Sequence, residues 1–156
     1  MHAALPLLLL SLSAGPATLD PQGYQFVELP AFVAKTLKDH PDLAKREGGQ
    51  DTATFHGMER IRFPATWTGQ KRPLAGFKAE VVQKWLAQNA PSMKAAFRQE
   101  IQVKDGDREV WVPIQETLLP FLAKEVKAGK QVGIYAVFMG SANEELILLV
   151  NEFKPL

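Results

Sequence analysis

The sequence predicts an α+β fold, in which an antiparallel sheet that curls or partly closes is packed against helices. Two pairs of apolar segments, within residues 97–112 and 131–153, are each joined by a short turn, and consecutive hairpins build antiparallel sheets. Apolar residues at helical spacing mark three further segments, which begin at Leu29, Gly76 and Thr117. The 156 residues are 46% hydrophobic and 22% charged, which suits one domain with a real core.

The N-terminal residues differ in character from the rest of the chain. Leu5 to Ala14 is an apolar run followed by small residues, shorter than the roughly 20 residues that span a bilayer. The run is typical of a secretory signal with cleavage after Ala14 or Ala17, although no Lys or Arg precedes it. A buried N-terminal helix or an apolar tail is the alternative. We therefore predict a signal peptide over residues 1–17 and a single globular domain over residues 18–156.

The first half of the domain is predicted to contain a lead-in segment, a helix and a strand. Residues 18–24 form a polar segment that we expect to be mobile. A helix follows from Leu29 to Asp39, with Pro30 tolerated in its first turn and Pro41 ending it. Residues 58–67 alternate between apolar and polar side chains, as a half-buried strand does.

The second half is predicted to begin with a helix, which is followed by two hairpins separated by a further helix. A basic turn over residues 69–73 leads into the helix Gly76–Asn89, and an Asp105–Gly106 turn of type I′ joins the next two strands. Thr117 is placed to cap a third helix. The final pair of strands is apolar on both faces, so we expect one face on the sheet core. The other face would be covered by a helix, either the one that carries Phe32 and Leu37 or the one that carries Phe77, Val81 and Trp85.

The order of these elements resembles the OB-fold, a five-stranded partly open barrel with a helix between its third and fourth strands. No motif accompanies this resemblance. The five strands that it implies are Met58–Trp67, Phe97–Val103, Arg108–Val112, Gln131–Met139 and Glu144–Phe153. The helix Gly76–Asn89 would be an insertion in the first loop. A helix-covered open antiparallel sheet is the alternative.

Charge and composition exclude several classes of function. Eighteen basic and 17 acidic residues leave a net charge of +1, so no strong field favours nucleic acid. The absence of cysteine excludes disulfides, thiol catalysis and thiolate metal sites. We expect no cofactor, no metal and no membrane span in the mature chain.

The candidate catalytic residues carry weak signals. His56 and Glu59 have the spacing of metal ligands on a helix, but Gly57 and the following strand argue against one there. Asp39, His40 and Asp42 resemble a helix end. No Gly-x-Ser-x-Gly elbow and no glycine-rich phosphate loop occurs in the sequence. Glu152 interrupts an apolar run, either as a buried hydrogen-bonded group or where the strand reaches solvent.

A mixed basic and aromatic surface is the best ligand-binding candidate in the sequence. Aromatic stacking beside cations suits a sugar, an oligonucleotide or an anionic peptide, although a plain solvated face fits the same residues. The predicted binding residues are Arg62, Lys71, Arg72, Arg98 and Trp111.

Two hypotheses for function follow from these observations. One is a small exported, non-catalytic binding or accessory domain of the cell envelope, periplasmic or secreted, acting on an unknown protein or envelope ligand. The other is an exported hydrolase-like enzyme that uses Glu or His in a cleft between the barrel and the inserted helix. A cleft in which His56 or Glu152 meets a second titratable group would favour the enzyme.

The signal-peptide hypothesis predicts that the mature protein begins near Thr18 and is found outside the cytoplasm. Cleavage after Ala17 removes the apolar run without removing any Lys, Arg, Asp or Glu. Intact mass and N-terminal sequencing of the native product measure this directly, and a retained Met1 would contradict it.

Overall fold

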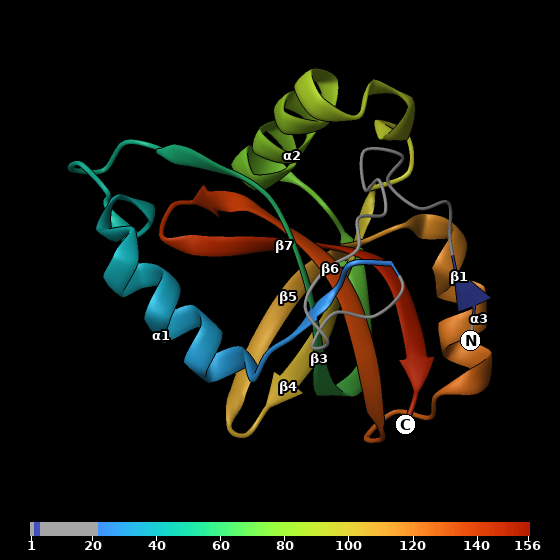
Figure 1. The fold of residues 1–156 in the computed structure, drawn as a ribbon. Helices are drawn as coiled ribbons and strands as arrows, with labels where there is room; N and C mark the ends of the chain where they lie inside the picture. Colours follow the sequence, from blue (N-terminus) through green and yellow to red (C-terminus); the bar gives the residue numbers. More distant parts are fainter. Residues whose placement is uncertain (1, 4–21) are drawn as a thin grey trace.

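The computed structural model describes residues 2–3 and 22–156, which form a single β-rich domain with three α-helices (Figure 1). The predicted signal peptide, residues 1–17, lies outside the described residues except for His2 and Ala3. The strands are β1 (His2–Ala3), β2 (Gln25–Phe26), β3 (Ala53–Pro73), β4 (Gln99–Asp105), β5 (Arg108–Ile114), β6 (Gln131–Ala142) and β7 (Glu145–Pro155). The α-helices are α1 (Leu29–Asp39), α2 (Gly76–Asn89) and α3 (Leu119–Glu125), and the 3-10 turns are η1 (Pro41–Ala44), η2 (Pro91–Met93) and η3 (Glu116–Leu118).

The strands form one mixed sheet, so the α+β class is confirmed and the antiparallel prediction is wrong. Most neighbours are antiparallel, but β2 runs parallel to β3, and β5 runs parallel to β7. The path β3–β4–β5–β7 continues through β6 back to β3. Its β5–β7 link is a single residue pair, Ile114 with Val150, and the sheet is not a regular barrel.

The strand β3 is much longer than predicted. It covers residues 53–73 rather than 58–67, so the expected basic turn at residues 69–73 is strand instead. Its first part pairs with β6, and from Thr66 onward it pairs with β4. The local alternation was visible in the sequence, but the length depends on these two partners.

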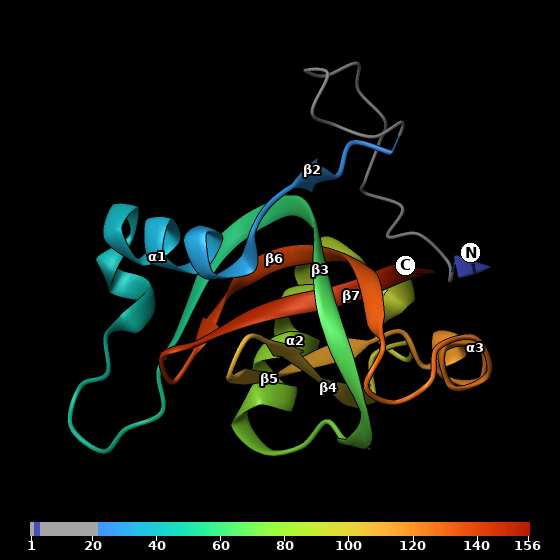
Figure 2. The same cartoon turned by 90° about the horizontal axis from the view of Figure 1, so that it is seen from below.

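The last hairpin is buried on both faces, as predicted. One face of β6, which includes Ile134 and Phe138, belongs to the core shared with β3, β4, β5 and β7, and α1 packs against this core. The other face, which includes Val137 and Met139, packs with Trp85 and its neighbours on α2. Figures 1 and 2 show α2 on one side of the sheet and α1 at one end of it. The helix α2 spans the residues predicted for it.

The turn of the first hairpin differs from the predicted type. The β4–β5 turn has Gly106 and Asp107 at its centre, because Asp105 pairs with Arg108. Only Gly106 of the two has a positive φ, which is the type II′ pattern rather than type I′. In the β6–β7 turn the central residues Asn143 and Glu144 have φ of 48° and 71°, so the type I′ pattern occurs here, without glycine.

The shift in the β4–β5 turn moves every cross-strand pair by two residues. A turn centred on Asp105 and Gly106 would place Trp111 opposite Glu100, whereas the observed turn places it opposite Gln102. A two-residue shift preserves the face of each side chain, so Trp111 remains on the face opposite to buried Val112. In the third helix, η3 occupies residues 116–118 before α3, and Thr117 provides no cap.

A buried polar network fixes the segment before α1. Tyr24 is 1% exposed, its hydroxyl accepts a 2.8 Å hydrogen bond from Asn151 Nδ2, and its ring meets Tyr135 edge-on at 5.3 Å. Gln115 donates to the amide oxygen of Asn151. The expectation of a mobile lead-in is therefore wrong at Tyr24, since burial of a polar hydroxyl requires such partners. Glu152, 4% exposed, is buried as well.

The two-sided burial of the last hairpin predicts a graded response to truncation. Ile134→Ala and Leu148→Ala should each lower the free energy of unfolding by about 2–5 kcal/mol, the range for large-to-small changes in cores. Trp111→Ala should cost less, because that ring is only half buried and lies on the outer face. Denaturant melts of the three variants test this, and an equal loss for Trp111→Ala would contradict it.

Candidate functional site

A cavity with a volume of about 620 Å³ lies between α1 and β3, within the usual range for ligand sites. Val27, Ala31 and Phe32 supply apolar surface. The charged and imidazole side chains of the lining are Glu28, Lys35, Asp39, His40, His56 and Glu59. It is not the cleft beside the inserted helix that the enzyme hypothesis expected, because α2 lies on a different side of the sheet (Figure 1).

A bulge in β3 brings His56 into this cavity. Phe55 pairs with Gly140 and Glu59 with Phe138, so three residues of β3 lie opposite one residue of β6. In a regular strand, residues three apart point to opposite faces. His56 and Glu59 are three apart, yet both line the cavity. Bulges re-aim side chains in this way and are common beside functional sites.

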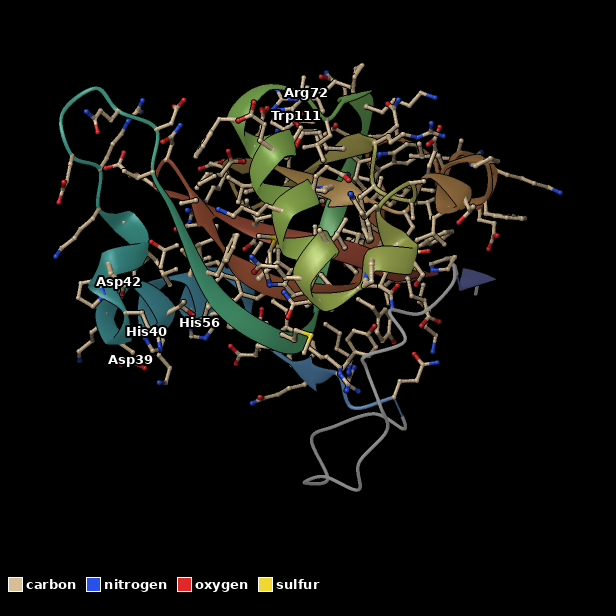
Figure 3. The ribbon with its side chains drawn as sticks, turned by 90° about the horizontal axis from the view of Figure 1, so that it is seen from above. Asp39, His40, Asp42, His56, Arg72 and Trp111 are labelled. Carbon is tan, nitrogen blue, oxygen red and sulfur yellow. The ribbon has the colours of Figure 1, made fainter. Side chains whose placement is uncertain are left out.

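The two histidines meet at one end of the cavity. His40 follows the last residue of α1, and its backbone N–H donates to Thr36 O at 2.9 Å. Its ring meets that of His56 edge-on at 4.6 Å, and the His56 ring also lies 4.9 Å from Phe138. Figure 3 shows His40 and His56 close together, with Asp39 and Asp42 beside them.

The charges of the cavity are only partly balanced. Lys35 forms an ion pair with Asp39, and this hydrogen bond raises the pKa of Lys35 and lowers the pKa of Asp39. Both groups therefore stay charged around neutral pH. Glu28 and Glu59 also line the cavity, which leaves two negative charges in excess when both histidines are neutral.

The side chains that line the cavity can bind a ligand through charge and hydrogen bonds. His56 and Glu59 form at most a loosely placed acid–base pair. His56 Nε2 lies 3.8 Å from Glu59 Oε2, which is beyond hydrogen-bond distance. Throughout residues 2–3 and 22–156, no three side chains of the ligand types gather to hold a metal ion. None of the helices described is long and apolar enough to cross a membrane.

Of the five residues predicted to bind a ligand, the structure brings only Arg72 and Trp111 together. The Arg72 guanidinium carbon lies 3.9 Å from the Trp111 ring centroid. Arg62 instead stacks over Phe26, 5.5 Å from its ring, and Arg98 pairs with Glu116 at 2.8 Å. Lys71 is exposed near the end of β3. The predicted residues are therefore spread over several parts of the molecule.

Arg72 and Trp111 belong to an ion-pair cluster that holds α2 against the sheet. Lys78 Nζ on α2 lies 2.8 Å from Glu100 Oε2 and from Glu145 Oε1, and it donates to Trp111 O at 3.0 Å. Arg72 Nε donates to the other oxygen of Glu100, which is only 3% exposed. Since Arg72 stacks on one face of the Trp111 ring, a ligand that stacks on that face must displace it.

The cavity was not predicted, because Gly57 and the following strand argue against a helical metal site at His56 and nothing else nearby indicates a function. The signal that could have found it is Gly57, since a glycine within an alternating pattern indicates a bulge. The nearness of His40 had no local signal, because sixteen positions separate it from His56.

Comparison with protein families finds none that matches the sequence, and comparison with curated proteins finds no match either.

Gly140 pairs with Phe55, next to the bulge, and must remain a glycine for β3 to approach β6. A methyl group added there would lie 2.0 Å from Thr54 O, and φ is +144°. Gly140→Ala should therefore lower the free energy of unfolding by about 3 kcal/mol or more and shift the NMR signals of His56. Gly133→Ala in the same strand is the matched control, because its nearest atom lies at 3.4 Å. Equal stability of the two variants would contradict this.

Proposed function

We propose that the protein is a small exported binding or accessory domain of the cell envelope, and that its ligand occupies the cavity between α1 and β3. The observation that carries this proposal is the bulge at residues 56–58. It interrupts the ladder of β3 and β6, and it directs His56 into a cavity that His40 also lines. A bulge weakens a sheet because regular hydrogen-bonded pairs are lost. A bulge that lies beside a cavity therefore favours the interpretation that it is there for function.

Export is the second part of the proposal and rests on the apolar run from Leu5 to Ala14. A cysteine-free domain outside the cell depends on its hydrophobic core for stability. The two buried clusters on either face of β6 are consistent with that requirement.

We also propose that the circuit of β3, β4, β5, β7 and β6 is a distorted OB-like barrel. The strand order supports this, as do the positions of α3 between β5 and β6 and of α2 in the first long connection. OB-folds bind ligands on the face of their second and third strands, which correspond to β4 and β5. Here that face carries the ion pairs of Lys78 and Glu100, which favours the α1–β3 cavity as the ligand site.

A hydrolase-like enzyme is the second candidate. The observation in its favour is that the His56 ring contacts that of His40 and lies near Glu59 in a cavity, although this cavity is not beside the inserted helix. A histidine oriented by a carboxylate can activate water, provided that the 3.8 Å separation closes when substrate binds. Cleavage of chromogenic esters or glycosides that is lost in His56→Gln would establish this candidate over the first.

Binding at the cavity can be tested with a library of small amines, acids and neutral compounds. Histidine side-chain NMR signals should shift for His40 and His56, with affinities in the millimolar to micromolar range typical of fragments. Phe32→Ala should weaken these shifts by removing apolar surface from the cavity, whereas Arg98→Ala, at an exposed ion pair, should not. Shifts confined to Trp111 and Arg72 would contradict the cavity and support the surface predicted from sequence.

A further inference from the structure

One side of β3 is left without a strand neighbour along the cavity. Ile61 pairs with both Gln25 of β2 and Ala136 of β6, so these two strands lie on opposite sides of β3. Thr66 likewise pairs with both β4 and β6. The side that β2 and β4 share has no strand partner between Ala53 and Glu59 within the part of the chain that the structure describes.

The residues along this stretch of β3 are exposed. Residues 55–59 are all exposed, whereas alternate residues from Ile61 to Trp67 are buried. The His56 side chain is only 23% exposed, so much of the exposed surface of that residue belongs to its backbone. An accessible strand edge is a template for pairing with another chain, and proteins usually cover or charge such edges.

The chain itself already adds a strand to this side, but stops short. Gln25 and Phe26 run parallel to Ile61 and Arg62, and Val27 N donates to Arg62 O at 2.9 Å. Because β2 runs parallel to β3, the pairing in the direction of Glu59 ends at Gln25, and beyond Val27 the chain turns into α1, which faces β3 across the cavity. The pairing geometry is therefore available on this side of β3 at the point where the cavity begins.

The charges beside this edge favour a cationic partner. Glu28, from the turn into α1, and Glu59, on β3, both line the cavity, and no ion pair with Lys or Arg is found for either within the described chain. Asp39 is held by Lys35. Phe32 adds an apolar surface against which the stem of a lysine or arginine can pack.

We propose that the ligand is a short extended segment of a basic polypeptide, which pairs with the open side of β3 from His56 to Glu59. Its backbone completes the sheet edge, and a lysine or arginine side chain reaches Glu28 and Glu59. This recognition mode, strand addition, takes affinity from main-chain hydrogen bonds and specificity from alternate side chains. Four residues at about 3.3 Å each span roughly 13 Å. The proposal rests on the cavity being the binding site.

The test uses four defined probes with the full chain: acetyl-Val-Lys-Val-Lys-Val-amide, its glutamate counterpart, its backbone N-methylated form and spermidine. The lysine peptide should bind and slow amide hydrogen exchange at residues 56–59. The glutamate peptide should bind at least about tenfold more weakly, since like charges oppose each other across the site. N-methylation should abolish binding, because it removes the donors that pair with β3.

Variants with matched charge separate the site from general electrostatics. Glu59→Gln should weaken the lysine peptide about fivefold, which corresponds to about 1 kcal/mol for a partly exposed ion pair. Glu116→Gln removes the same charge at the exposed ion pair with Arg98, outside the lining of the cavity, and should leave binding unchanged.

Three results would overturn the inference. These are no binding of the lysine peptide at millimolar concentration, equal binding of the glutamate peptide, or equal binding of spermidine without protection of residues 56–59. The last would identify a small amine as the ligand class. If library compounds still bind at His40 and His56, the proposed binding function stands while the peptide inference fails; if neither they nor the peptides bind, both fail.

Discussion

The sharing of β3 between two neighbours is the constraint on which the rest of the structure depends. Its first part pairs with β6 and its last part with β4, and both strands pair with Thr66 at the point of transfer. A strand that changes partners along its length forces the sheet to curl, because each neighbour adds the same sense of twist. The curled sheet then encloses one apolar cluster and turns the outer face of β6 and β7 toward α2.

The cavity is a consequence of the geometry of β3 near its N-terminal end. Near its N-terminal part, β3 is pressed against β6 at Gly140, where only a residue without a side chain fits. Directly beside that contact, the three residues of the bulge lift away from the ladder. The helix α1 packs on the core through Phe32, whose ring meets Phe138 edge-on at 5.6 Å. The space between helix and strand is therefore bounded by fixed elements, which is how a binding site keeps its shape before a ligand arrives.

The ion-pair cluster on the other side of the sheet has a different role. Glu100 is a buried carboxylate, and a buried charge without partners is strongly destabilising. Arg72 and Lys78 supply two cationic partners from β3 and α2. The cluster thus positions α2 over the hydrophobic face that it covers, and it uses two of the groups that sequence patterns suggested for ligand binding. Basic and aromatic side chains of this kind can bind a ligand or stabilise the fold, depending on whether their charges already have partners within the chain.

Local sequence determined the elements and their faces, whereas the tertiary structure decided pairing, length and site. Alternation and helical spacing correctly gave α1, α2 and the apolar faces of β6, since these depend on neighbours within a few residues. The parallel links β2–β3 and β5–β7, the full extent of β3 and the burial of Tyr24 were not predicted, because each depends on residues far apart in the chain. The pairing of His40 with His56 is the clearest case. One residue ends a helix and the other lies in a bulge, and only the packing of α1 on the curled sheet brings the two rings together.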